Sequence, residues 1–162
     1  MEIKDAIIRD LAFLNNKYLY GLILIYLSYI GYTDFKHRKI PNIATYSMVI
    51  IRIILHFTKI FPFTGSSLIG AVLFFLLFFT VAYQKNIRMG GDIKAVFALG
   101  LYFGIGGSLV INSGAIFFGL LYFFFRYLKG EPVTQDINAP YGFFLLLSTI
   151  VCGAYYIFTI PA

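Results

Sequence analysis

Long apolar runs alternate with short polar segments along the chain. The runs begin near residues 18, 43, 66, 93 and 141, and the fourth of them is long enough for two helices. A helix needs about 20 apolar residues to cross the roughly 30 Å hydrocarbon core of a membrane. The pattern therefore predicts an all-α polytopic membrane protein with about six transmembrane helices, over residues 18–33, 43–60, 66–83, 141–160 and twice within 93–128.

Two boundaries in this pattern depend on proline and glycine. Proline suits the first turn of a helix, so Pro41 is expected to begin the second span. The turn between spans four and five falls either at residues 104–107 or at residues 112–114, and the sequence does not decide between them.

The first 17 residues differ from the rest of the chain. Charged residues there alternate with apolar residues at helical spacing, namely Ile3, Ile7, Leu11 and Leu14. Such a pattern is typical of an amphipathic helix that lies in the membrane interface. The chain is therefore expected to consist of an interfacial segment, residues 1–17, and a six-span membrane domain, residues 18–162.

Composition supports the membrane assignment and narrows the function classes. Hydrophobic residues make up 60% of the 162 residues and charged residues only 12%, against about 25% charged in soluble domains. The single cysteine, Cys152, excludes an intramolecular disulfide and a cysteine-based zinc site. Neither a metal nor an organic cofactor is expected.

The net charge of +6 comes from bases in short loops, which favours membrane topology and anionic lipid over nucleic acid as the explanation. The loops after spans one, three and five hold eight bases: Lys36, Arg38, Lys39, Lys85, Arg88, Lys94, Arg126 and Lys129. The opposite side holds four: Lys4, Arg9, Lys17 and Lys59. By the positive-inside rule, the three basic loops lie in the cytoplasm and both termini lie outside.

Two aspartates are expected at the same membrane face. Asp34 ends span one and Asp92 opens span four, and spans of odd and even number cross in opposite directions. Each has a simpler structural explanation. Asp92 could be only a helix N-cap, and Asp34 could pair with Arg38 one helical turn later.

Together the two carboxyl groups suggest an aspartic-protease dyad. In such a dyad two close carboxyl groups cannot both ionise, so one takes a proton from water while the other polarises the scissile carbonyl. Gly90 and Gly91 precede Asp92 and lack side chains, which would let an extended substrate backbone come close. Two carboxylates and a glycine pair form a weak signal by themselves.

Three segments carry a resemblance to a known family. DFKHRKIPN (34–42) resembles the Asp-x5-Ile-Pro-Asn segment of the type IV prepilin peptidases and preflagellin peptidases. MGGDIKAVFALG (89–100) is similar to their Gly-x-Gly-Asp-x-Lys segment, and APYGFFLLL (139–147) to the Pro-x-Gly start of their last span. The segments follow the family's order from the beginning to the end of the chain.

The resemblance implies a six-span aspartic endopeptidase that removes short basic leaders from prepilin-like precursors at the cytoplasmic face. It makes Asp34 and Asp92 the catalytic pair. The motif-supporting residues would be Pro41, Asn42, Gly90, Gly91 and Lys94, of which Lys94 should point away from Asp92 toward a lipid phosphate or a loop carbonyl.

Two departures from the family pattern affect these expectations. Met89 stands where the first glycine of the second motif falls, which changes the loop before the acid. The cytosolic segment with paired cysteines found in many bacterial members is absent, so a peptidase without N-methyltransferase activity is expected.

Other functions stay open at this stage. A small proton- or cation-coupled transporter would also use paired acids, and a catalytically inactive pilus-assembly protein would tolerate Met89. Arg52 and His56 share one face of span two, where bonds to backbone carbonyls inside the bundle are favoured over a functional role. The sequence does not name the pilin-like substrate, the cleavage-site residues or whether the chain forms a homo-oligomer.

Overall fold

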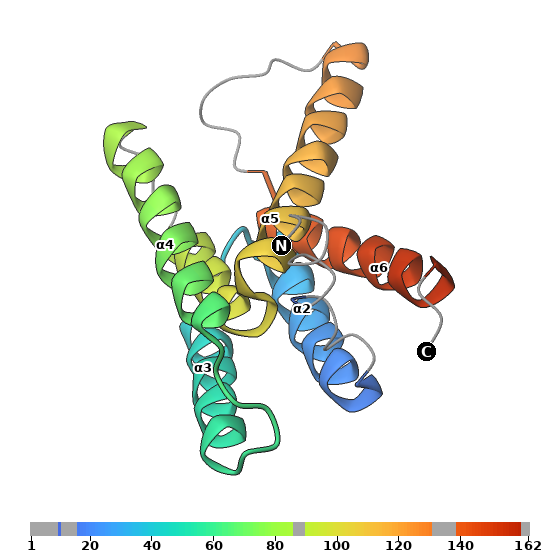
Figure 1. Ribbon diagram of the computed structural model, residues 1–162. Helices are drawn as coiled ribbons and strands as arrows, with labels where there is room; N and C mark the ends of the chain where they lie inside the picture. Colours follow the sequence, from blue (N-terminus) through green and yellow to red (C-terminus); the bar gives the residue numbers. More distant parts are fainter. Residues whose placement is uncertain (1–9, 11–15, 86–89, 131–138, 160–162) are drawn as a thin grey trace.

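The computed structural model describes residue 10 and residues 16–85, 90–130 and 139–159. These residues form α2 (Lys17–His37), α3 (Asn42–Phe57), α4 (Gly65–Lys85), α5 (Gly90–Leu128) and α6 (Tyr141–Thr159), shown in Figure 1. The described part of the chain contains no strand, so the all-α prediction is confirmed. The predicted amphipathic helix over residues 1–17 lies almost wholly outside the described residues.

Proline and glycine mark the helix starts close to where the sequence predicted them. Pro41 is the N-cap of α3 rather than its first residue, with an extended backbone at φ −66° and ψ 128°. The helix α4 begins at Gly65, one residue before the predicted start. Both observed starts lie within one residue of the predicted ones, because a turn residue marks the beginning of an apolar run in each case.

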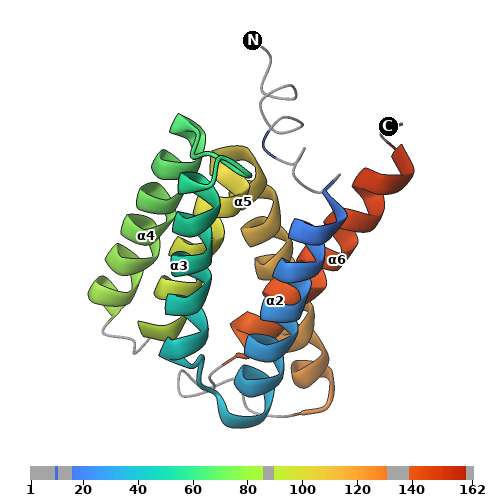
Figure 2. The same cartoon turned by 90° about the horizontal axis from the view of Figure 1, so that it is seen from below.

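Gly104 breaks α5 into two arms, residues 90–103 and 105–128. Its φ of +64° and ψ of −166° are not helical, and this conformation is almost restricted to glycine. In Figure 2 the first arm rises beside α3 and α4, and the second descends beside α6. The break thus falls at the first of the two turn positions that the sequence left open.

The backbone groups freed by this break are bonded by side chains from elsewhere in the chain. The Ser66 hydroxyl accepts the Ile105 N–H at 3.0 Å and donates to the Asp10 carboxylate at 2.7 Å. The same carboxylate oxygen accepts the Gly106 N–H at 2.9 Å. The start of the second arm is therefore capped although its own sequence supplies no capping side chain.

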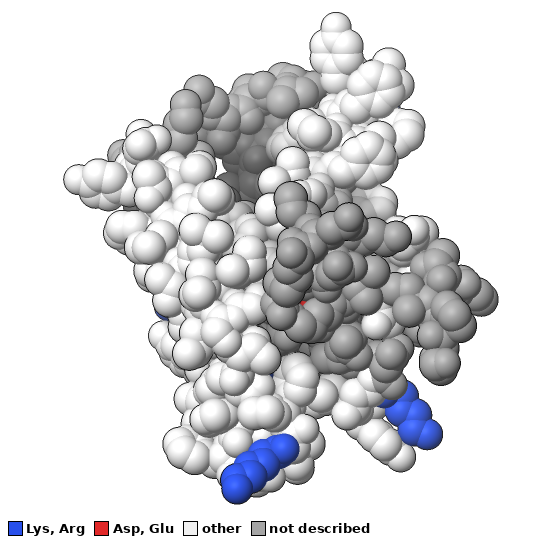
Figure 3. Space-filling model, in the orientation of Figure 1, with Lys and Arg blue, Asp and Glu red and all other residues white. Residues whose placement is uncertain are grey.

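Length and composition identify two helices that are able to cross a membrane, α4 over Gly65–Gln84 and α5 over Gly90–Leu128. The apolar helices Asn42–Phe57 and Tyr141–Tyr156 are shorter. The face in Figure 3 shows few charged side chains among the described residues, and many large apolar side chains are exposed. These features agree with a membrane-associated protein, while the number of about six spans remains a prediction.

The helix termini gather at two opposite ends of the bundle. Figure 2 shows the start of α2 and the end of α6 at one end, and the end of α2, the start of α3 and the end of α5 at the opposite end. The start of α6 also lies toward that second end. Segments distant in sequence, including the α2–α3 linker and the first turn of α6, are thereby brought together.

The helices α4 and α5 approach each other closely enough for their backbones to touch. A Cβ atom on Gly100 would lie 2.5 Å from Ala71 Cα, and one on Gly70 would lie 2.6 Å from the Gly104 carbonyl carbon. Gly100 therefore acts in close helix packing, whereas Gly104 supplies the break.

We expect Gly100→Ala to destabilise the protein by about 1–3 kcal/mol, because the added methyl group meets backbone that cannot rotate away. Thermal unfolding in detergent measures the change. Gly21→Ala is the matched control, since a Cβ there meets no atom of the described residues within 4 Å beyond its own turn of helix. Equal melting temperatures for the two variants would contradict the close packing.

Arg52 is completely buried and bonds three backbone carbonyls, as favoured from the sequence. Its Nε donates to the Leu101 carbonyl at 2.8 Å, and its two terminal nitrogens donate to the carbonyls of Phe61 and Pro62. The aromatic rings of Phe61 and Phe63 lie 4.3 Å from the guanidinium carbon. Arg52 thus ties the α3–α4 loop to the first arm of α5.

Candidate functional site

Asp34 lies in the last turn of α2 and is 5% exposed. Its carboxylate oxygen Oδ2 accepts the backbone N–H of Gly142, in the first turn of α6, at 2.8 Å. The helix ends at His37, and Arg38 takes a left-handed conformation with φ 53°. Arg38 therefore lies outside the helix, where it acts on Asp34 by its charge and not as a side chain one turn along the same helix.

Asp92 lies in the first turn of α5. This helix begins two residues earlier, at Gly90, so the alternative in which Asp92 is the N-cap is wrong. The Asp92 carboxyl group interacts electrostatically with Asp34 and with the Tyr141 hydroxyl. An acid in the first turn remains favourable to the helix dipole. The structure thus brings together two carboxyl groups from distant parts of the chain.

Ile40 of the α2–α3 linker fills the space between these elements. A Cβ atom on Gly91 would lie 3.0 Å from Ile40 Cβ, and one on Gly142 would lie 3.3 Å from both Ile40 Cδ1 and Asp34 Oδ2. Among the described residues beyond its own turn of helix, no atom lies within 4 Å of the corresponding position on Gly90. Gly91 therefore allows the linker to approach α5, and the open position of the glycine pair is Gly90.

The remaining motif residues join α3 to α5. The Lys94 ammonium donates to the side-chain oxygen of Asn42 at 3.0 Å and lies 5.5 Å from the centre of the Tyr46 ring. In this structure the partner of Lys94 is therefore an amide, rather than the lipid phosphate or loop carbonyl that the sequence favoured. The contact holds the N-terminal turn of α3 against that of α5. Met89 lies outside the described residues.

The environment of Asp34 acts on its proton affinity in two directions. Asp34 follows the last residue of the predicted first span, and burial raises the pKa of its carboxyl group above the ordinary value. The Gly142 N–H and the positive charge of Arg38 act in the opposite direction. The carboxyl group is thus desolvated, yet it keeps partners for its charged form.

The sequence did not assign a role to Gly142, Tyr141 or Ile40. Tyr141 donates its hydroxyl proton to Asn112 Oδ1 at 2.6 Å, which ties the start of α6 to α5. The Pro-x-Gly segment was the available signal, because it placed Gly142 at a position typical of the family. Among the described residues, no three His, Cys, Asp or Glu side chains gather as a metal site would require.

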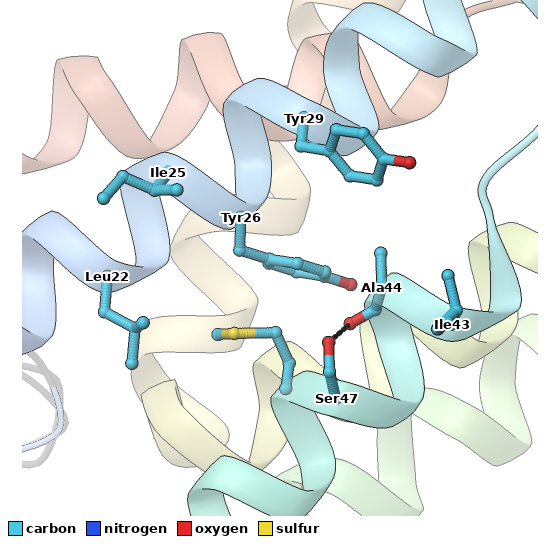
Figure 4. Close-up of a pocket in the computed structure, with 8 residues that line it drawn as sticks. Leu22, Ile25, Tyr26, Tyr29, Ile43, Ala44 and Ser47 are labelled. Atoms are coloured by element: carbon cyan, nitrogen blue, oxygen red, sulfur yellow. Dashed lines mark hydrogen bonds between the residues drawn. The ribbon is translucent and has the colours of Figure 1, made fainter.

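An apolar cavity of about 340 Å³ lies between α2 and α3 and opens to the surface (Figure 4). Two of the polar side chains that line it are bonded within the protein. The Ser47 hydroxyl donates to the Ala44 carbonyl at 2.8 Å, and the Tyr26 hydroxyl donates to Thr45 Oγ1 at 3.5 Å. The cavity offers mainly apolar surface, and its described lining includes no Asp, Glu, His, Lys or Arg.

The fold and the site define a helical, membrane-associated protein with paired carboxyl groups at one end. Residues 21–124, more than half of the chain, match the model of the type IV leader peptidase family. The chain belongs to this family, as its motifs indicated. No curated protein and no solved structure matches it. The matched residues include both aspartates, whereas Gly142 lies beyond them.

Proposed function

We propose that the chain is a membrane-embedded aspartic endopeptidase that removes the short basic leader from prepilin-like precursors, type IV pilins or archaellins. The observation that carries the proposal is the pairing of Asp34 and Asp92 at one end of the bundle in a member of a leader peptidase family. The protein would be a multi-pass protein of the cytoplasmic membrane with this end facing the cytoplasm.

The proposed reaction is hydrolysis of one peptide bond by water. The ionised carboxylate takes a proton from water, the water oxygen attacks the scissile carbonyl carbon, and the protonated carboxyl group gives its proton to the carbonyl oxygen. Collapse of the tetrahedral intermediate breaks the C–N bond. The amine leaves with the proton taken from water, and the remaining hydroxyl proton returns to the dyad.

The supporting residues would position the substrate and the two acids. Gly90 provides open backbone beside Asp92, and Gly91 allows Ile40 to pack against α5. Pro41 would set the start of α3, and the bond between Lys94 and Asn42 would hold that start against the start of α5. The apolar part of the substrate would approach sideways from the bilayer, along exposed helix faces such as the cavity between α2 and α3.

The pH dependence of cleavage is expected to be bell-shaped, because the dyad works only with one proton shared between two carboxyl groups. Activity falls at low pH as both groups become protonated and at high pH as both ionise. Burial raises the pKa of Asp34, so the bell is displaced toward neutral pH relative to ordinary carboxylic acids. Initial cleavage rates across pH test this. A rate that keeps rising into alkaline solution would contradict the shared proton.

Co-expression with a prepilin-like precursor tests the proposed function. The mature N-terminus of the precursor is read by mass spectrometry, beside a matched culture that lacks the peptidase. We expect the basic leader to be removed just before the apolar helix of the substrate. Intact leaders on pilin and archaellin precursors alike, from correctly inserted protein, would instead favour the transporter or the inactive assembly protein.

A further inference from the structure

The two carboxyl groups of the candidate dyad have different surroundings. Asp34 Oδ2 receives the Gly142 N–H at 2.8 Å, and the positive charge of Arg38 acts on the same carboxylate. Within the described residues, no hydrogen bond reaches the Asp92 carboxyl group. The two carboxyl groups therefore differ in the hydrogen-bond donors that contact them.

The donor to Asp34 is a helix N-terminal amide. Gly142 is the second residue of the 19-residue helix α6, and the first N–H groups of a helix have no partner within it. These groups carry partial positive charge and stabilise an anion. A bond of this kind favours the ionised form of the carboxyl group that accepts it.

The groups that face Asp92 supply no comparable stabilisation of a negative charge. Asp34 of α2 faces it with a carboxylate, and a like charge nearby favours the protonated form. Tyr141 of α6 already donates its hydroxyl proton to Asn112. On α5 itself, the ammonium of Lys94 donates to Asn42.

We propose that the Gly142 N–H fixes Asp34 as the ionised member of the dyad, so that Asp92 holds the shared proton. This inference rests on the proposed function. Asp34 takes the proton from the attacking water, and Asp92 gives its proton to the scissile carbonyl oxygen. When the intermediate collapses, Asp34 passes its proton to the leaving amine, and Asp92 recovers a proton from the former water. Gly142 is a positioning residue, because it acts through Asp34.

Titration of each carboxyl group in the absence of the other tests this assignment. The full-length protein, labelled with ¹³C at the aspartate carboxyl carbon, is placed in lipid nanodiscs as Asp92→Asn and as Asp34→Asn. The carbon signal of the remaining dyad carboxyl is followed by NMR, with Asp34→Asn/Asp92→Asn identifying the signals that belong to other aspartates. We expect Asp34 to lose its proton at a pH lower by about one unit or more than Asp92.

Gly142→Ala tests whether the Gly142 N–H causes the difference between the titration midpoints of Asp34 and Asp92. The new methyl group would lie 3.3 Å from Asp34 Oδ2, so we expect the carboxylate to shift by a few tenths of an ångström and its bond to the N–H to weaken. In the Asp92→Asn background this change should raise the titration midpoint of Asp34. In the Asp34→Asn background it should leave Asp92 unchanged. Gly21→Ala, in open space on α2, should change neither midpoint.

Equal midpoints, or a lower midpoint for Asp92, would overturn the assignment. An Asp34 midpoint that does not respond to Gly142→Ala would overturn the role of Gly142. Because no substrate is present, the result is independent of cleavage. If Asp34 loses its proton before Asp92 but no leader is cleaved, the assignment of the proton stands and only the proposed peptidase function fails.

Discussion

Asparagine at either position 34 or position 92 is expected to abolish leader cleavage. Asparagine has nearly the same shape as aspartate, but its amide neither takes a proton from water nor supplies an acidic proton to the scissile carbonyl. General acid and base catalysis contribute about 10²–10⁴-fold each, and a dyad that loses one member loses both functions. We therefore expect a decrease of ~10³-fold or more, measured as the rate of precursor cleavage by purified protein in lipid.

Asp10→Asn is a suitable control for this loss. Asp10 accepts hydrogen bonds from Ser66 and Gly106 at the break in α5, and an asparagine oxygen is still able to accept them. This variant should retain cleavage within about tenfold of the native rate. The helix content of all three variants is compared by circular dichroism. Cleavage that persists in Asp34→Asn or Asp92→Asn would end the dyad proposal.

Arg52→Met is expected to cause the largest loss of stability among single changes outside the site. Methionine fills a similar volume but donates no hydrogen bond, so the carbonyls of Leu101, Phe61 and Pro62 lose their charged donor. A hydrogen bond to a charged group contributes about 1.5–3 kcal/mol, so the loss of three such bonds indicates a loss of at least ~3 kcal/mol. Thermal unfolding in detergent measures this change.

Two further variants separate the charge of Arg52 from its shape. Arg52→Lys keeps the charge but lacks the planar fork that reaches three carbonyls, so an intermediate loss of stability is expected. Ile53→Met, at the next residue of α3 and 39% exposed, should change little. An unfolding temperature for Arg52→Met equal to that of Ile53→Met would contradict the anchoring role of Arg52.

Helix positions and the pairing of the two aspartates were accessible from the sequence for physical reasons. Apolar runs give the helices, and Pro41 and Gly65 mark where two of them begin. The common location of Asp34 and Asp92 follows from the alternation of span direction, which requires no knowledge of side-chain contacts. Motif spacing then supplied the chemical interpretation of the pair.

The position of the break in α5 could not be predicted, because glycines at both candidate turns permit it. Contacts from other elements distinguish the two. Ser66 and Asp10 cap the residues after Gly104, and the backbone of Gly70 packs against the Gly104 carbonyl. At the other candidate turn, the space beside Gly114 is occupied by Ser148 of α6. These contacts exist only after α4 and α6 have packed against α5.

The partners of Asp34 and Arg52 were also outside the reach of sequence reasoning. Asp34 bonds a backbone N–H and Arg52 bonds backbone carbonyls, and nearly every residue carries both kinds of group. Side-chain identity therefore gives no indication of which one is used. The partner of Lys94 was missed for a related reason, since Asn42 reaches it only through the packing of α3 on α5.

A double-mutant cycle on the two aspartates tests the central claim most directly. Cleavage of a prepilin-like precursor is measured for the native protein, Asp34→Asn, Asp92→Asn and Asp34→Asn/Asp92→Asn under the same conditions. If the two carboxyl groups act as one catalytic unit, the double variant is no slower than either single variant, and each is slower than the native protein by ~10³-fold or more. Losses that multiply in the double variant, or a single variant with near-native cleavage, would contradict the account.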